Sequence, residues 1–248
     1  MDVEQMAAGL DVNGFVEAVH SDGFAIVEDV ISQPEVDRLR DAVAAVPLGE
    51  EVRRRRQTYG VRNLLEVCEE VRRLAGDERL RRYATAVLGD DCFAVRAIFF
   101  DKVPDANWGL GWHQDSVIAV RERKEVSGFV AWSRKASVLQ VQPPAEVLAE
   151  MLAIRVHLDD CDEQNGPLRI LPGSHRHGWL DNEIDDWRQR VSEKICEVRS
   201  GGIVAMRPLL LHASAAAAAP HRRGVIHIEY AYRDLPGGLQ WNRQVRSC

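Results

Sequence analysis

The stretch Trp112-His-Gln-Asp-Ser-Val-Ile-Ala119 decides how the rest of the chain is interpreted. It contains the triplet His-x-Asp, ends in the apolar run Val-Ile-Ala, and is expected to form a strand. Because side chains alternate between the two faces of a strand, His113 and Asp115 are expected on one face and Gln114 on the other. The stretch therefore predicts a strand that presents an imidazole beside a carboxylate.

The regions around this stretch have a β pattern. From Cys92 onward, apolar and β-branched residues gather in short runs that Gly, Pro, Asp and Asn clusters separate. The predicted strands are 92–103, 112–119, 127–132, 152–159, 167–171, 202–206, 208–212 and 223–232. Short strands without long helices between them favour a double-sheet jelly roll over a parallel α/β sheet. A short helix is expected within 145–153, and residues 181–199 are interpreted as a long surface excursion.

The first third of the chain has a helical pattern. Residues 12–47 predict a helix, a strand at 23–27 and a second helix that Ser32 caps, and residues 63–88 have apolar residues at mainly helical spacing. The basic run 53–56 is interpreted as a solvated helix end or loop, with an anion or acyl-carrier contact as the alternative. With 248 residues, one domain is expected. The expected fold is mainly β with α: a cupin-like double-stranded β-helix core at 92–248, on which helices of residues 1–91 pack.

Charge and cysteine usage narrow the function classes. The net charge of −6 and the pI near 5.8 argue against a nucleic acid or an anionic membrane as the main partner. The five cysteines are scattered without a C-x-x-C pair, so a reduced, cytoplasmic setting is expected. No signal peptide is expected at the N-terminus, and no run approaches the ~18 to 20 apolar residues that cross a bilayer. A monomer or homodimer is expected.

Two further residues give the His-x-Asp triplet a chemical meaning. The triplet alone is weak, because a strand histidine beside an acid is common without a metal. His212, however, follows the apolar run Leu209–Leu211, and Arg223 opens a later strand 11 residues (223 − 212) further on. Two imidazoles and one carboxylate can form the facial site that leaves open positions on iron(II). An arginine fixed inside a barrel needs an anion, and a dicarboxylate matches its fork geometry.

With these residues the chain resembles the phytanoyl-CoA dioxygenase family of oxygenases that depend on iron(II) and 2-oxoglutarate. The resemblance extends over nearly the whole length, in motifs that come in a fixed order. These are Asp22-Gly-Phe-Ala-Ile-Val-Glu-Asp29, Asp101-Lys-Val-Pro-Asp105 before Trp112-His-Gln-Asp115, His157-Leu-Asp-Asp160, Asn165-Gly-Pro-Leu168, Leu171-Pro-Gly-Ser-His175, His212-Ala-Ser214, and Arg223 before Ile226-His-Ile-Glu-Tyr-Ala231. Several ordered motifs at compatible spacing make the match specific.

The resemblance implies a double-stranded β-helix fold and a set of ligands. Iron(II) would be bound by His113, Asp115 and His212, and 2-oxoglutarate by that iron and by Arg223. Lys102 and Ser214 match positions that contact this cosubstrate, although a surface lysine and a turn serine remain alternatives. Molecular oxygen (O2) would be the oxidant, with ascorbate as a supporting reductant.

Two comparisons with the family pattern refine this implication. Many relatives have polar residues where this chain has the alanine run 215–219, which removes a polar contact to cosubstrate or substrate. Halogenating members have a small residue in place of Asp115, so hydroxylation or a related oxidation is expected here. Arg222 is expected on the opposite face of the strand from Arg223.

The other histidines and the turns are expected to be secondary. Asn165-Gly166 and Pro172-Gly173 are interpreted as turns that shape the jelly roll. His175 and His177 are expected in an exposed loop, with a contact to substrate as the alternative. His157, His221 and His227 are poorer ligand candidates, although the first and last could face the pocket.

The expected function is oxidation of a C–H bond in a small-molecule substrate, with release of succinate and CO2. The alternatives are a non-catalytic metal-binding jelly roll, or a cupin-like zinc or manganese isomerase or hydrolase, against which Arg223 argues. Trp108, Trp132 and Gln142 are expected to flank the cavity and contact substrate, with core packing as the alternative for the tryptophans. The substrate itself is not predicted, although the acidic surface disfavours a CoA thioester.

Overall fold

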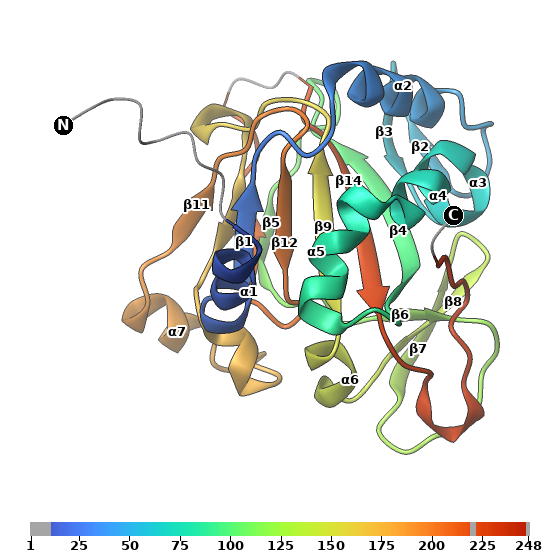
Figure 1. Ribbon diagram of the computed structural model, residues 1–248, viewed down its shortest axis with the longest axis vertical. Coiled ribbons are helices and arrows are strands. Elements are labelled where there is room, and N and C mark those ends of the chain that lie inside the picture. The colour runs from blue at the N-terminus through green and yellow to red at the C-terminus, as the bar shows by residue number, and fades with distance from the viewer. Residues whose placement is uncertain (1–10, 219–221, 247–248) are drawn as a thin grey trace.

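A large antiparallel sheet forms the centre of the computed structural model, which describes residues 11–218 and 222–246 (Figure 1). Its strand order is β1-β12-β9-β14-β4-β3-β2. The bounds are β1 Phe24–Val27, β12 Ile203–Met206, β9 Leu152–His157, β14 Gly224–Ala231, β4 Phe93–Asp101, β3 Thr58–Val61 and β2 Val52–Arg54. Residues 24–61 thus contribute both edge strands of this sheet, β1 and β2, and the strand β3 beside β2.

Two smaller sheets complete the β structure. The order β11-β10-β13-β5 makes the second layer of the jelly roll, with β11 Lys194–Cys196, β10 Leu168–Ile170, β13 His212–Ser214 and β5 Leu110–His113. A separate sheet has the order β6-β8-β7, with β6 Ile118–Val120, β8 Val138–Gln142 and β7 Val130–Lys135. The expected double-stranded β-helix is therefore confirmed, with an additional three-stranded sheet.

The helices of the first third lie in front of the large sheet in Figure 1. Their bounds are α1 Val12–Ser21, α2 Gln33–Ala44, α3 Leu64–Val67, α4 Glu69–Gly76 and α5 Glu78–Leu88, and two short helices follow, α6 Ala145–Ala149 and α7 Ile184–Arg190. Ser32 caps α2 as expected, through a capping box with Glu35. Single 3₁₀ turns occupy Glu163–Asn165, Ser174–His177 and Pro236–Gly238.

The two faces of the large sheet have different partners. Ile154 and Val156 of β9, and Ile226 and Ile228 of β14, pack with the helices in one apolar cluster. The residues between them project toward the second sheet, because strand side chains alternate. Arg155 of β9 is one of these, and it is buried although it is charged. The helices thus cover the apolar face and leave a partly polar face between the sheets.

Residues 112–119 do not form one strand, contrary to the prediction. β5 ends at His113 and pairs with β13, whereas β6 begins at Ile118 and pairs with β8 in another sheet. The connecting residues change sheets, and the Asp115 amide donates to the Pro208 carbonyl at 2.9 Å. His113 is therefore the last residue of a strand, and Asp115 lies just beyond it.

The predicted strand 208–212 is also wrong, since β13 begins at His212 instead of ending there. Leu209, Leu210 and Leu211 pack into three different apolar clusters. A strand offers only two faces, so a turn is needed to send three consecutive side chains in three directions.

Other differences concern segments that were not predicted as strands. The basic run 53–56 begins within β2 and is not a helix end. The excursion 181–199 contains α7 and β11, and 138–142 forms β8. Within the described part of the chain, no helix is long and apolar enough to cross a membrane.

Candidate active site

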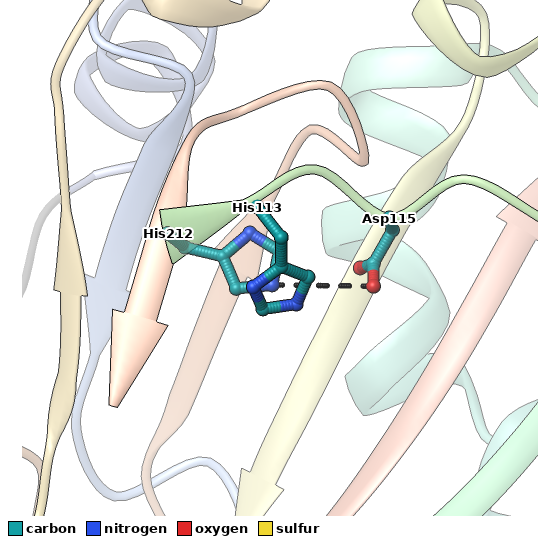
Figure 2. Close-up of side chains that lie close together, drawn as sticks. All are labelled: His113, Asp115 and His212. Carbon is teal, nitrogen blue, oxygen red and sulfur yellow. Dashed lines mark ion pairs between the residues drawn. The ribbon is translucent and has the colours of Figure 1, made fainter. Parts of the chain in front are cut away.

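The structure brings together the three residues expected to bind metal. His113 at the end of β5 and His212 at the start of β13 are directly paired across the two antiparallel strands, with ring centroids 4.1 Å apart. Asp115 follows β5, and its Oδ1 lies 3.9 Å from His212 Nε2 (Figure 2). One ligand atom from each residue lies within 4.8 Å of the others. A strand pair and the turn after it thus create a cluster of two nitrogens and one oxygen.

Hydrogen bonds orient both imidazoles toward this cluster. His113 Nδ1 lies 2.8 Å from the Gly111 carbonyl oxygen, and His212 Nδ1 lies 2.8 Å from the Leu210 carbonyl oxygen. Because a carbonyl oxygen only accepts, each Nδ1 carries the proton and each Nε2 keeps its lone pair for a metal. Oδ2 of Asp115 is buried without a hydrogen-bond partner in the described structure. An unpaired carboxylate oxygen beside two unprotonated nitrogens fits a divalent cation such as iron(II).

The electrostatics keep the cluster ready to bind a cation at neutral pH. Burial lowers the pKa of His212 to about 4, although Asp115 acts in the opposite direction. Burial alone would raise the pKa of Asp115, but His212, His227, His113 and Arg155 together lower it below its ordinary value. The histidine is therefore neutral and the aspartate is ionised, which is the protonation that metal binding requires.

Two buried cations lie in the same region. Arg223 is 2% exposed and Lys102 is 1% exposed. The Arg223 Nη1 donates to the Gly166 carbonyl at 2.9 Å, and the Lys102 Nζ donates to the carbonyls of Gly166 and Ala215. Arg223 Nε is buried without a partner among the described residues. Burial, and then the charge of Arg223, lowers the pKa of Lys102 to about 7. Apart from the Cys161 side chain beside Arg223, both cations contact neutral backbone carbonyls, so their charge can be matched by a bound carboxylate.

Gly166 has a more direct role than that of a turn residue. Its φ is +72°, and a Cβ at this position would lie 2.5 Å from the Ala215 carbonyl oxygen and 2.8 Å from Lys102 Nζ. Only glycine avoids both the strained conformation and these contacts. The turn therefore allows its carbonyl to reach both cations.

The metal-binding cluster and Arg223 line one cavity of about 540 Å³ between the sheets. Trp108 and Ser214 also line it, whereas Lys102 does not. Trp132 and Gln142 do not. They lie on β7 and β8, and Trp132 packs against an apolar cluster of the additional sheet. The structure therefore gives these two residues no place at the cavity.

The remaining histidines and Arg222 lie in different surroundings. His227 lines the cavity, with Nε2 at 3.9 Å from Asp115 Oδ2. His157 is buried, and neither of its ring nitrogens has a hydrogen-bond partner in the described structure. His175 is half-buried and lines a different hollow, so the prediction that it is exposed is wrong, whereas His177 is exposed and lies against Trp187. Arg222 has a side chain 44% exposed and lies 3.5 Å from Asp101, while Arg223 points inward, so the two arginines face opposite ways as expected. His221 is outside the described residues.

Sequence reasoning missed several charged residues that line the cavity. Arg155 of β9, Glu229 of β14 and Arg96 of β4 all line it, and Arg96 and Glu229 form an ion pair at 3.1 Å. The alternation of apolar and polar residues in Ile154-Arg-Val-His157 and in Ile226-His-Ile-Glu229 is the signal that could have identified them. Such alternation is usually interpreted as a strand with one solvent face. Here the polar face is internal.

A jelly roll that holds two histidines and an aspartate beside a buried arginine defines a class: oxygenases that depend on iron(II) and 2-oxoglutarate. The family model described as phytanoyl-CoA dioxygenase (PhyH) matches residues 19–225, and the chain belongs to this family.

Relatives and solved structures are similar to most of the chain. The L-proline trans-4-hydroxylase of Streptomyces griseoviridis is 24% identical in an alignment that covers 84% of this chain and 82% of that protein. The ectoine dioxygenase of Stutzerimonas stutzeri is 23% identical over 65% of this chain, but the match spans only 50% of that protein. The crystal structure of EctD from S. alaskensis with bound Fe has a TM-score of 0.72 at 19% identity, covering 98% of this chain and 89% of that chain. AviO1 from Streptomyces viridochromogenes Tue57 has a TM-score of 0.67 at 23% identity, over 93% of this chain and 98% of that one.

Proposed function

We propose that the chain is a dioxygenase that uses iron(II) and 2-oxoglutarate to hydroxylate, or otherwise oxidise, a C–H bond of a small molecule. The observation that carries the proposal is the cross-strand pair His113 and His212 with Asp115, in the same cavity as Arg223. Family membership supports it, as do relatives named as a proline hydroxylase and ectoine dioxygenases.

In this proposal the triad residues bind iron(II) through two imidazole Nε2 atoms and one carboxylate. The backbone carbonyls of Gly111 and Leu210 hold the two rings in position by accepting their Nδ1 protons. Bound iron with 2-oxoglutarate supplies the oxidising chemistry, in which O2 is consumed and succinate and CO2 are released. With only three protein ligands, the metal would still be able to bind these reactants.

Arg223 and Lys102 would bind the carboxylate of 2-oxoglutarate that is remote from the metal. Both cations are inside the protein, where a carboxylate is held strongly because water does not screen it. Ser214, on the strand that starts with His212, would contact the same cosubstrate. The substrate would occupy the remaining space, toward Trp108 and Tyr59, whose rings meet edge to face at 6.0 Å.

The proposal is tested by measuring succinate release with iron(II), ascorbate and 2-oxoglutarate across a panel of small molecules. The expected result is succinate formation coupled to a substrate product that is heavier by one oxygen atom. The matched control is Asp115→Ala, which should release none. Anaerobic titration with 2-oxoglutarate provides an independent measurement. A protein that binds neither iron(II) nor 2-oxoglutarate would be a non-catalytic jelly roll, and activity with zinc or manganese instead of iron would identify another enzyme class.

A further inference from the structure

Arg155 is a buried cation that has no acidic partner. It lies on β9 in the middle of the large sheet, is 6% exposed and lines the cavity. Its Nη1 is 3.4 Å from His227 Nδ1, its guanidinium carbon is 4.8 Å from the centre of the Phe100 ring, and Nε is buried without a partner. No described carboxylate lies within ion-pair distance of it. Burial, and then the charge of Arg223, lowers its pKa to about 10, so it remains charged at neutral pH.

The hydrogen bond to His227 leaves one edge of this guanidinium available. Because arginine only donates, His227 accepts at Nδ1 and carries its proton on Nε2, which points toward Glu229 at 3.5 Å and Asp115 at 3.9 Å. The protein therefore occupies Nη1, and no described residue accepts a hydrogen bond from Nη2 or from the buried Nε. A carboxylate can bind such an edge with two parallel hydrogen bonds.

A count of charges shows that the metal and 2-oxoglutarate would not neutralise Arg155. Iron(II) and Asp115 together carry one positive charge, and the carboxylate of 2-oxoglutarate next to the metal cancels it. The second carboxylate is matched by Arg223 and Lys102, whose combined charge already exceeds its own and leaves none of it for Arg155. Arg96 is paired with Glu229. Arg155 would thus remain charged and unpaired in a site from which substrate excludes water, a state that costs free energy unless an anion arrives.

The entrance of the cavity is also positively charged. Arg53 and Arg62 line it, and neither forms an ion pair with any residue that the structure describes. Burial lowers the pKa of Arg62, and the charges of Arg96 and Arg53 lower it further, so the three guanidinium groups are close enough to repel one another. A cationic entrance on a chain of net charge −6 attracts and selects anions.

We infer that the substrate is a small carboxylic acid, whose carboxylate pairs with Arg155 beside the metal site. This inference rests on the proposed function and names its substrate class. One uncompensated charge on a planar guanidinium matches a carboxylate better than a phosphate dianion, which would need a second cation at the same place. The entrance arginines attract the acid, and Arg155 fixes the acid group so that the same C–H bond always faces the metal.

The test combines two variants with paired probes. Arg155→Met removes the charge at similar volume, and Arg155→Lys keeps the charge without the fork. The protein, loaded with iron(II) and 2-oxoglutarate under anaerobic conditions, is mixed with amino acids, short fatty acids and aromatic acids, each compared with its uncharged amide. Thermal stabilisation is measured. We expect acids to bind the wild type at least tenfold more tightly than their amides do. Arg155→Met should abolish this preference, and Arg155→Lys should retain part of it. The affinity of Arg155→Met for 2-oxoglutarate should stay within threefold of the wild-type value.

The crossed control is Arg223→Met, which should lose 2-oxoglutarate affinity. A wild type that prefers no acid over its amide overturns the inference, and so does an Arg155→Met variant that keeps the preference. An Arg155→Met variant with tenfold weaker 2-oxoglutarate binding would assign this arginine to the cosubstrate instead.

A second measurement needs no ligand. The melting temperature of the free Arg155→Met protein should equal or exceed that of the free wild type, because an unpaired buried charge has been removed. A large decrease would mean that Arg155 is structural. Failure of the wild type to bind 2-oxoglutarate would instead contradict the proposed function.

Discussion

Replacing Arg223 with alanine should separate a 2-oxoglutarate enzyme from any other metal-binding jelly roll. The guanidinium is 2% exposed, and its Nη1 donates to the Gly166 carbonyl at 2.9 Å. It is not part of the metal-binding cluster. Its loss should therefore weaken the binding of 2-oxoglutarate and change iron affinity little.

The magnitude follows from the burial of this residue and from its neighbour. Removing one partner of a buried charge pair costs about 2 to 5 kcal/mol. The charge of Arg223 contributes to the low pKa of Lys102, about 7 in the free protein. Without Arg223, Lys102 is protonated more readily and replaces part of the lost attraction. The lower end of the range is therefore expected, and about 2 to 3 kcal/mol corresponds to roughly 30- to 150-fold weaker binding.

Anaerobic optical titration of the iron-loaded protein with 2-oxoglutarate measures this change. Arg223→Lys should recover only part of the loss, because a point charge does not reproduce the bidentate fork. Arg222→Ala is the matched control, since that side chain is 44% exposed, and its effect should be less than about threefold. If Arg222 is the sensitive position, the assignment of the two strand faces is wrong. If neither substitution matters, the 2-oxoglutarate site lies elsewhere.

Four more substitutions and one pH series test the remaining assignments. His113→Ala or Asp115→Ala should abolish iron retention in metal analysis while circular dichroism stays near wild type, because neither side chain is part of an apolar cluster; full activity would remove the proposed site. Asp115→Gly should lose the hydroxylated product in mass spectrometry even when iron is loaded, since water or chloride takes the open position, and retained hydroxylation would contradict the role of this carboxylate. A bound anion should raise the pKa of Lys102, which is about 7 in the free protein. Binding of 2-oxoglutarate above pH 7 therefore takes up a proton, so its affinity should fall from pH 7 to pH 9. Lys102→Met should bind more weakly and flatten this dependence, whereas an equal slope in wild type and variant would exclude Lys102 as its origin.

Much of the fold could be predicted from the sequence because its strands are short, apolar and separated by turn residues. The strands at 92–103, 152–159 and 223–232 were predicted close to β4, β9 and β14, which form the centre of the sheet. Errors occurred where tertiary packing overrides local pattern. Nothing local shows that 112–119 changes sheets after His113, or that three successive leucines at 209–211 enter three clusters.

The residues of the site differ in how well sequence could find them. His113, Asp115 and His212 could be proposed because their spacing and order are specific, and the structure places them together. Arg155 could not be proposed, because an arginine between Ile154 and Val156 is equally typical of a strand with one face exposed to solvent. Only knowledge that both faces of β9 are covered changes that interpretation.

The alternation in β9 and β14 connects stability with function. On one face Ile154 and Ile226 pack with the helices, and on the other Arg155 and His227 line the cavity. Burying cations opposes folding, so the apolar face must stabilise the sheet that holds them. A cationic cavity is compatible with the net charge of −6, because the arginines gather where an anion would bind and the acidic residues are in excess over the rest of the chain. Ligands that neutralise the cavity should stabilise the fold, since they bind only the folded chain.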